Sequence, residues 1–508
     1  MLPVPDAVPV GWLIACLRDV VEEVETVDPG QSPDRQFTYV DIGAINNTSG
    51  SVVAPRRVSG ADAPSRARQA IREHDVLFST VRPYLRAIAM SPSFQNGVAS
   101  TGFCVLRAAQ GVDPRFLFRV VRSDAFIEHV LPFQRGSSYP AVRDADILDR
   151  QIPLPPKGEQ ARIADRLDEL LTDLDQAVGE LIAAQEKLTQ YRQSLLKAAV
   201  EGALTAEWRA QNPPQETGAE LLARILRERR ARWEARQLER FTAQGKVPPT
   251  DWRAKYVEPA MPASATEAAA ATTWACASIG QCFQVAMGAT PSRKEPSYWG
   301  GTVPWVSSGE VRFERIAATR ECISEAGLNN SSTRMNPVGS VLLGMIGEGK
   351  TRGQVAILGI PATNNQNCAA IWVSETDIPP EFVYYWLWSR YDETRRGSSG
   401  NNQPALNKTL VEAMPLPVPP VAEAREIVSR VDAQLAGIAA QEREIEQLLR
   451  MATAQRQNIL RAAFSGQLVP QDPNDEPAGA LLARIAQARL GAERSPKPRK
   501  PRTIKEPA

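Results

Sequence analysis

The sequence predicts an α+β protein made of two tandem copies of one unit, in which a globular domain is followed by a long helix. Three observations support this prediction. Similar segments recur at a constant separation, each copy contains short β-type runs broken by Gly, Pro, Asn and Ser, and each copy ends in a long amphipathic stripe. A chain of 508 residues is long enough for more than one hydrophobic core.

The constant separation is 264 residues. RQSLLKAAVEGAL from Arg192 matches RQNILRAAFSGQL from Arg456, and RLDELL from Arg166 matches RVDAQL from Arg430. With small gaps, RGSS from Arg135 also matches RGSS from Arg396. Because separate segments share one spacing, the chain is interpreted as an internal duplication.

Each globular domain is followed by a proline-rich hinge, IPLPPKG or MPLPVPPV, and then by the long helix. Apolar residues recur there at steps of three and four, which is typical of coiled-coil partners. The first helix would span about 66 Å at 1.5 Å per residue. We therefore expect two long antiparallel helices that pack together, with Gly202 and Gly466 at their C-terminal ends. The stripe residues are Ile163, Leu167, Leu170, Leu174, Val178, Leu181, Leu188, Leu195 and Ala199, and then Ile427, Val431, Leu435, Ile438, Ile445, Leu448, Ala452, Ile459 and Ala463.

These patterns divide the chain into six segments. They are a first globular domain (1–152), a central long helix plus an arginine-rich helix (153–245), a linker (246–273), a second globular domain (274–413), a distal long helix (414–490) and a basic tail expected to be disordered (491–508).

The net charge of the chain does not indicate a binding partner, because its 59 basic and 58 acidic residues nearly cancel. Charge is informative only in segments where one sign predominates. Eleven arginines and four acidic residues lie between Ser51 and Arg122, a cluster that fits a polyanion such as nucleic acid or a merely solvated surface. The six cysteines form no C-x-x-C pair and only two histidines are present, so no zinc site is expected. No signal peptide or membrane-spanning run is evident, and a cytoplasmic location is expected.

Two short motifs resemble catalytic signatures. GMIGEGKT, from Gly344 to Thr351, fits the phosphate-binding P-loop pattern, but RGQVAILGIP follows it and reads as a strand rather than a helix. We expect a tight β-turn there, not an ATP site. Asn212-Pro213-Pro214-Gln215 resembles an amino-methyltransferase motif but carries Gln215 where that motif has an aromatic residue. It is interpreted as a loop.

The duplicated layout, the hinges and the helix ends EGALTAEWR and SGQLVPQDPNDEPA resemble the DNA-specificity subunit of type I restriction–modification enzymes. LFSTVRPYLR, MIGEGKTRGQVAILGIPATNNQN and RGSSGNNQPALN resemble segments of that family's target-recognition domains. The resemblance covers nearly the whole chain.

The resemblance implies that each domain reads one half of a split, asymmetric sequence in double-stranded DNA. It also implies that the paired helices set the unread gap and dock two modification subunits. Those partners would bind S-adenosylmethionine and methylate adenine, and a restriction subunit would use ATP and magnesium to translocate and cleave DNA. This chain would hold no cofactor and catalyse no step by itself.

Arginine suits guanine, Asn and Gln suit adenine, and Ser suits phosphate. The candidate DNA contacts are Arg82, Tyr84, Arg86, Arg135, Ser137, Ser138 and Tyr139 in the first copy, and Lys350, Arg352, Arg396, Ser398, Ser399, Asn401, Asn402, Gln403 and Lys408 in the second. The simpler interpretation of both RGSS segments is a turn that joins a helix to the hinge. Two other functions stay open: a coiled-coil scaffold that binds proteins, and an NTPase that rests on GMIGEGKT alone.

Overall fold

The computed structural model describes residues 8–262, 271–347, 350–396 and 406–494. Two compact units emerge, residues 1–181 with 447–508 (unit 1) and residues 182–446 (unit 2). The division falls inside the two long helices, α4 (Lys157–Val200) and α12 (Val421–Phe464). Each helix has 44 residues, and their bounds are 264 positions apart, which confirms the spacing inferred from the sequence.

Unit 1 contains three sheets. Their strand orders are β2-β11-β8-β9-β5-β4, β6-β3-β10-β7 and β1-β12. The strands are β1 (Leu13–Cys16), β2 (Val21–Glu22), β3 (Gln36–Val40), β4 (Ile45–Asn46), β5 (Ser51–Val52), β6 (Arg56–Ser59), β7 (Ala67–Ala70), β8 (Val76–Ser79), β9 (Ile88–Met90), β10 (Gly97–Ser100), β11 (Phe103–Ala108) and β12 (Gln151–Leu154).

Three short helices lie between β11 and β12 in unit 1: α1 (Pro114–Val121), α2 (Asp124–Val130) and α3 (Asp144–Leu148). A further helix of this unit, α13 (Ala478–Arg494), follows α12. The core of unit 1 joins residues from the sheets, from α4 and from α12, including Phe78, Phe116, Ile163 and Phe464. Apolar burial therefore fixes the globular domain to the start of one long helix and the end of the other.

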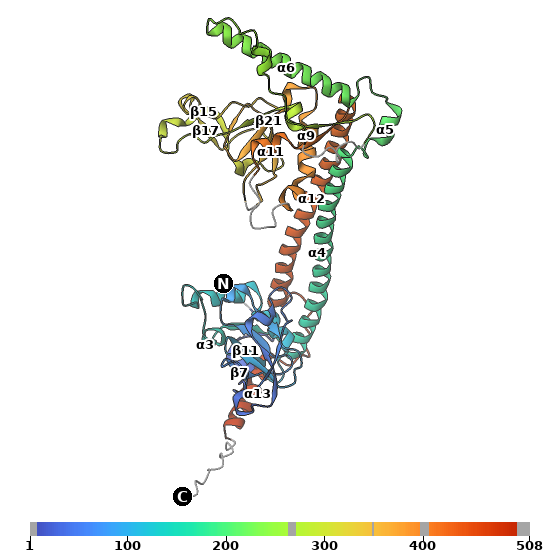
Figure 1. Ribbon diagram of the computed structural model, residues 1–508. Coiled ribbons are helices and arrows are strands. Elements are labelled where there is room, and N and C mark those ends of the chain that lie inside the picture. The colour runs from blue at the N-terminus through green and yellow to red at the C-terminus, as the bar shows by residue number, and fades with distance from the viewer. Residues whose placement is uncertain (1–7, 263–270, 348–349, 397–405, 495–508) are drawn as a thin grey trace. The chain divides into compact units, whose positions relative to one another are not determined.

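Unit 2 repeats this plan with sheets in the orders β14-β21-β18-β19-β16, β17-β15-β20 and β13-β22 (Figure 1). The strands are β13 (Ala275–Ser278), β14 (Gln284–Met287), β15 (Trp299–Val306), β16 (Arg315–Ile316), β17 (Glu321–Ile323), β18 (Val341–Gly344), β19 (Val355–Leu358), β20 (Thr363–Asn364), β21 (Cys368–Trp372) and β22 (Pro415–Val418). The helices are α5 (Ala206–Gln211), α6 (Gly218–Ala243), α7 (Ile279–Cys282), α8 (Glu325–Asn329), α9 (Pro380–Ser389), α10 (Tyr391–Arg396) and α11 (Lys408–Glu412).

The same two-stranded ribbon closes each globular domain. In unit 1, β1 pairs antiparallel with β12, and in unit 2, β13 pairs antiparallel with β22. A tryptophan precedes each ribbon and donates from its indole Nε1 to a glutamate in the first turn of a long helix. The distances are 2.9 Å from Trp12 to Glu159 and 2.8 Å from Trp274 to Glu423.

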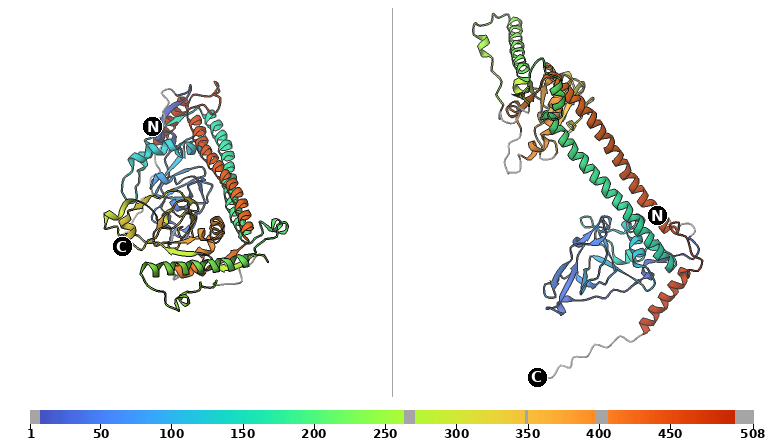
Figure 2. Two further views of the ribbon diagram at one scale, coloured as in Figure 1. Left: turned by 90° about the horizontal axis from the view of Figure 1, so that it is seen from above. Right: turned by 90° about the vertical axis from the view of Figure 1, so that its right-hand side faces the viewer.

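Within each unit, α4 and α12 lie side by side and run in opposite directions (Figures 1 and 2). An ion pair joins Arg456 to Asp175 in unit 1, and another joins Arg192 to Glu442 in unit 2. Gly202 and Gly466, each two positions after the last residue of its helix, adopt left-handed φ values of 74° and 73°, as expected for C-terminal glycines.

The predicted stripe is buried or half-buried except at one position. Leu448 is 40% exposed, so its assignment to the stripe is wrong, and Leu449 is half-buried instead. The step from Ile445 is therefore four residues rather than three. Both steps keep a residue near the same helix face, and the sequence pattern alone does not choose between them.

The segment predicted as a linker is not wholly extended. Residues 244–262 return along α6, and Trp252 in this segment is 6% exposed. Residues 263–270 lie outside the described residues. Asn212-Pro213-Pro214-Gln215 lies between α5 and α6, which confirms the loop interpretation.

Candidate nucleic-acid interface

Two predicted segments of unit 1 lie together. A β-bridge joins Val81 to Ala141, and the Arg82 backbone N–H donates to the Pro140 carbonyl at 2.7 Å. The Arg82 guanidinium donates to the Ser138 carbonyl at 3.1 Å and lies 4.8 Å from the centre of the Tyr139 ring. The loop after β8 and the RGSS segment therefore form one surface, although Arg82 and Ser138 are 56 positions apart in the sequence.

The backbone of this loop is constrained. Arg82 and Arg86 have φ values of 49° and 56°, and they flank a 3-10 turn at Pro83–Leu85. Residues other than glycine rarely adopt this left-handed backbone conformation, because it is strained. Such strained residues are often found at binding sites, where the surrounding structure holds them in place. The result is a rigid projection on which Tyr84 is 46% exposed.

The exposed rings give this surface a chemistry suited to nucleic acid. Tyr139 is 72% exposed and carries the Arg82 guanidinium on its face. Arginine can donate to phosphate or to a guanine edge, and aromatic rings can contact bases or sugars. Ser137 and Ser138 are also exposed beside Gly136, whose φ of 92° makes the turn.

Other arginines in this region already have acidic partners. Arg86 pairs with Asp124, and Arg135 pairs with Asp146 at 2.9 Å. The Arg143 backbone N–H, together with the guanidinium groups of Arg135 and Arg143, holds the pKa of Asp146 well below its usual range. Arg135 therefore stabilises the RGSS turn, and among the three candidate arginines of this region Arg82 alone forms no ion pair with the described residues.

In unit 2, GMIGEGKT begins with the last residue of β18, and its other described residues lie between β18 and the antiparallel strand β19. The Gly353 N–H donates to the Gly344 carbonyl at 2.8 Å, and the Gly344 N–H donates to the Gln354 carbonyl at 2.8 Å. Residues 348–349 are outside the described ranges, and the next element after β18 is the strand β19. A P-loop opens a helix at this point, whereas this segment joins two antiparallel strands, which agrees with the expected β-turn.

Lys350 and Arg352 occupy this turn. Lys350 is exposed, and its carbonyl accepts a 2.9 Å hydrogen bond from the Tyr391 hydroxyl of α10. Arg352 is half-buried, and its Nε has no hydrogen-bond partner in the described part of the chain. The turn is thus fixed to the helix that leads into the second RGSS segment.

The remaining candidates are less well placed. Arg396 ends α10, and its side chain is not described. Ser398, Ser399, Asn401, Asn402 and Gln403 lie outside the described residues. Lys408 is the first residue of α11, and its Nζ lies 3.5 Å from a carboxylate oxygen of Glu412.

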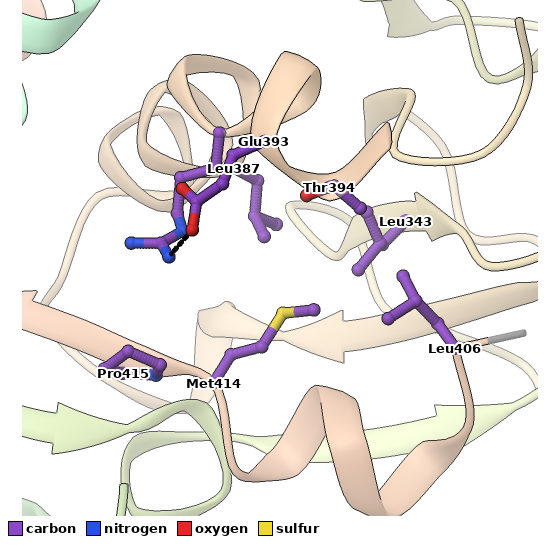
Figure 3. A pocket seen from close by; sticks show the side chains of 8 residues that line it. Leu343, Leu387, Glu393, Thr394, Leu406, Met414 and Pro415 are labelled. Carbon is purple, nitrogen blue, oxygen red and sulfur yellow. Dashed lines mark hydrogen bonds and ion pairs between the residues drawn. The ribbon is translucent and has the colours of Figure 1, made fainter. Parts of the chain in front are cut away.

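A cavity of about 240 Å³ lies next to this region (Figure 3). Its lining is mainly apolar, with the Arg390–Glu393 ion pair, at 2.7 Å, on one side: Leu343, Leu387, Arg390, Glu393, Thr394, Leu406, Met414 and Pro415. Pockets that hold small molecules usually measure about 300–1,000 Å³, so this cavity is small for a cofactor.

The structure also shows arginine–aromatic contacts that the sequence did not single out. Arg293 lies 3.6 Å from the Trp299 ring centre and donates to both carboxylate oxygens of Glu321, at 2.5 and 2.9 Å. In unit 1, Arg56 lies over Tyr39. The sequence gives little indication of these arginine–aromatic pairs, because their two residues lie 6 to 17 positions apart and meet only through the folding of strands and turns.

The described residues contain no group of His, Cys, Asp and Glu side chains that could hold a metal ion. All six cysteines are free thiols, and burial raises the pKa of Cys282 and of Cys368 to about 12. These thiols are protonated at neutral pH and are poor nucleophiles or ligands. None of the helices in the described ranges has the length and apolar character needed to cross a bilayer.

Comparison with known proteins identifies the family. The family model described as "Type I restriction modification DNA specificity domain" matches residues 34–183 and again residues 272–450. The specificity subunit of the type I restriction enzyme EcoDI of Escherichia coli is 25% identical over 391 residues, 75% of this chain and 78% of the relative. The corresponding HindI subunit of Haemophilus influenzae is 25% identical over 64% of this chain and 72% of its own length.

Solved structures agree with this match. A chain from a study of "complex assembly and conformational transition of the type I R-M system" superposes with a TM-score of 0.69 at 26% identity, covering 91% of this chain and all of its own. The HsdS subunit from Thermoanaerobacter tengcongensis gives a TM-score of 0.55, also at 26% identity, over 92% of this chain and all of its own. With two family segments on two copies of one fold, the chain belongs to the DNA-specificity subunits of type I restriction–modification systems.

Proposed function

We propose that each globular domain reads one half of a split, asymmetric DNA target and thereby directs a type I restriction–modification complex. The observation that carries this proposal is the pair of related but different surfaces. Unit 1 presents Arg82 and Tyr139 where two loops meet, and unit 2 presents Lys350 and Arg352 in a hairpin. Two surfaces with different side chains on one duplicated framework suit two different half-sites.

The two 44-residue helices would set the unread gap between the half-sites and would dock two modification subunits. Large apolar side chains on these helices remain exposed, which supports docking: Ile182 (46%), Tyr191 (50%), Leu448 (40%) and Met451 (57%).

The chemistry would belong to the partners. A modification subunit would bind S-adenosylmethionine and methylate N6 of adenine, and a restriction subunit, where one is present, would use ATP and magnesium. This chain would hold none of these cofactors and would act in the cytoplasm. The cysteine pKa values support a structural rather than a catalytic role for its thiols.

The decisive experiment maps adenine methylation across the host genome with the gene present and deleted. We expect a two-part motif with a fixed unread gap to disappear on deletion. Replacing residues 1–152 with the matching segment of a relative should change one half of the motif and leave the other half intact.

An unchanged methylation map, combined with no binding of split-sequence DNA by the purified complex at low salt, would contradict the proposal. It would instead favour a coiled-coil scaffold that recognises proteins. Binding to DNA should weaken steeply as salt rises, because phosphate contacts release counterions.

A further inference from the structure

One stripe along α6 changes character where the helix leaves the globular domain. Its positions follow steps of three and four. They are Gly218, Leu221 and Ile225, which are buried, and then Arg229, Arg232, Arg236 and Arg240. Residues at these steps share one helix face. The helix face that packs against unit 2 at the base of α6 therefore continues as four arginines, of which Arg229 and Arg232 are half-buried and Arg236 and Arg240 are exposed.

These arginines are largely unsatisfied. Among the described residues, neither Arg229 nor Arg240 forms an ion pair. Arg236 makes a single long hydrogen bond, 3.4 Å, to the Gln284 side chain. Arg232 lies 3.7 Å from Glu228, and its Nε is buried without a partner. A row of such groups attracts negative charge.

The arm formed by residues 226–262 is rigid although it projects from the sheets of unit 2 (Figures 1 and 2). Trp252 on the returning segment stacks on Trp233 of α6 at 5.9 Å, and Tyr256 meets the same ring edge-on at 5.3 Å. Arg253 adds an ion pair to Glu234 at 3.2 Å. These contacts hold the returning segment on a different face of α6, and Arg236 and Arg240 of the stripe are exposed.

The corresponding helix of unit 1, α13, does not carry the same row of arginines. In α13, Leu481 and Ile485 are buried against unit 1 as Leu221 and Ile225 are against unit 2. Arg489 takes the position of Arg229, but it donates to the backbone carbonyls of Arg18 and Val21 at 2.8 and 2.5 Å. Position 492, which matches Arg232, is an alanine. The extended arginine stripe is thus a feature of α6 within the described residues.

The arm lies at the opposite end of a sheet from the candidate DNA-contacting turn of unit 2. Arg236 contacts Gln284 at the start of β14, and Gln284 pairs with Trp372 at the end of β21. The turn that carries Lys350 follows Gly344, which pairs with Cys368 at the other end of β21. DNA held at that turn would approach unit 2 from the end away from the stripe.

Exposed apolar residues on the arm also favour a protein. Leu238 (41%), Val247 (89%), Val257 (84%) and Met261 (72%) are exposed, and apolar side chains stabilise protein interfaces but gain little from phosphates. Arginine, unlike lysine, is enriched at protein interfaces, and six of the seven basic residues between Leu226 and Lys246 are arginines.

We propose that the arginine stripe of α6 docks an acidic surface of the modification subunit that binds beside unit 2. This inference rests on the proposed function, since that function supplies the partner. The arginine stripe would provide the docking position beside unit 2 with a contact that the described residues of unit 1 do not provide. The two modification subunits would therefore bind with unequal affinity.

The test co-expresses the full chain with the modification subunit and determines stoichiometry by native mass spectrometry and affinity by titration. The stripe variant combines Arg229→Glu, Arg236→Glu and Arg240→Glu. The matched control combines Arg227→Glu, Lys246→Glu and Lys255→Glu, which makes the same charge change at exposed positions of the arm off the stripe. Thermal unfolding of both variants checks that the arm is intact.

We expect the stripe variant to bind one modification subunit as the wild type does and the other at least about tenfold more weakly, with the control close to wild type. Raising the salt concentration should weaken that second binding step in the wild type more than in the stripe variant.

Equal affinities for the stripe variant and the wild type would overturn the proposal. Unchanged assembly with weaker DNA binding would also overturn it and would identify nucleic acid as the occupant. Failure of the wild-type chain to bind any modification subunit would instead reject the proposed function, and this inference with it.

Discussion

At the scale of single residues, the two copies share a Trp–Glu hydrogen bond but differ in the other partners of the glutamate. Glu423 accepts hydrogen bonds from Trp274, from the Thr205 hydroxyl at 2.7 Å and from Arg209 Nε at 2.8 Å. Glu159 accepts one from Trp12 through Oε2, while its Oε1 is buried without a partner in the described residues. The positions that match Thr205 and Arg209 in the second copy hold valine and proline. Burial raises the pKa of Glu159 above its usual value.

This difference predicts that the same substitution destabilises the protein much more at Glu423 than at Glu159. Glu423→Gln breaks a buried charge-assisted network and should lower the free energy of unfolding by about 2–4 kcal/mol. Glu159→Gln should change it by about 1 kcal/mol or less at pH 7, because the amide oxygen can still accept from Trp12. Thermal unfolding of the full chain measures both variants, and equal losses would contradict the prediction.

The same pair predicts a pH dependence whose sign follows from the direction of the shift. Because the folded pKa of Glu159 lies above the unfolded value, the folded state disfavours the carboxylate, and the folded protein binds the proton more tightly. The contribution of Glu159 to stability is therefore least favourable at neutral pH and improves as the pH falls through its folded pKa. Glu159→Gln should remove this improvement when unfolding midpoints are compared across pH, and an unchanged profile would contradict the assignment.

Arg82 offers a test of DNA contact that separates the side chain from the backbone. Its φ of 49° is strained for most residues but ordinary for glycine, so Arg82→Gly should keep the loop conformation while removing the guanidinium. We expect DNA affinity of the assembled complex to fall by about tenfold or more, corresponding to roughly 1–3 kcal/mol for a lost base or phosphate contact. Arg86→Gly, which removes an arginine already paired with Asp124, is the control and should have a smaller effect.

At the scale of elements, the base of α6 is fixed by a backbone approach that the sequence does not reveal. A Cβ at Gly218 would lie 2.0 Å from the Val418 carbonyl oxygen and 2.7 Å from the Ala275 nitrogen. A Cβ at Gly479 in α13 would meet Leu13 Cδ2 at an ordinary 3.8 Å. In both helices, alanine has the higher intrinsic propensity, so propensity alone would favour both substitutions.

The contact of Gly218 with the ribbon reverses the expected effect of an alanine substitution on stability, whereas Gly479 lacks such a contact. Gly218→Ala should destabilise unit 2 by about 1–3 kcal/mol, because the backbone of β13 and β22 must move. Gly479→Ala should be neutral or stabilise the chain by up to about 1 kcal/mol. Thermal unfolding of the two variants side by side measures the difference, and a stabilising Gly218→Ala would show that the ribbon can shift without cost.

Much of the fold could be predicted from sequence because the evidence was repetitive or periodic. The separation of 264 residues and the apolar stripes predicted both long helices, whose bounds are also 264 positions apart, and the strand-like run that ends at Pro361 predicted a β-turn instead of a P-loop. The arm could not be predicted in this way, since Trp233 and Trp252 meet through a reversal of the chain that leaves no periodic signal. For the same reason, the meeting of Arg82 with Tyr139 depends on tertiary structure rather than on spacing.

At the scale of the whole molecule, α4 and α12 each belong to both units, so their length is a property of the chain rather than of either domain. Five of the predicted site residues, Ser398 to Gln403, fall outside the described residues, whereas the helices are continuous. A change in helix length therefore tests the bipartite proposal without knowledge of the bases that each unit reads.

Insertion of seven residues into the middle of both helices should keep the apolar stripes in register, because seven residues are close to two full turns. The insertion lengthens each helix by about 10.5 Å, which corresponds to up to about three base pairs at 3.4 Å each. Genome-wide methylation mapping should then show the same two half-sites with a longer gap. An insertion in only one helix would place seven unpaired residues opposite the other and should impair folding. Altered half-site bases with an unchanged gap would show that the helices do not set the spacing.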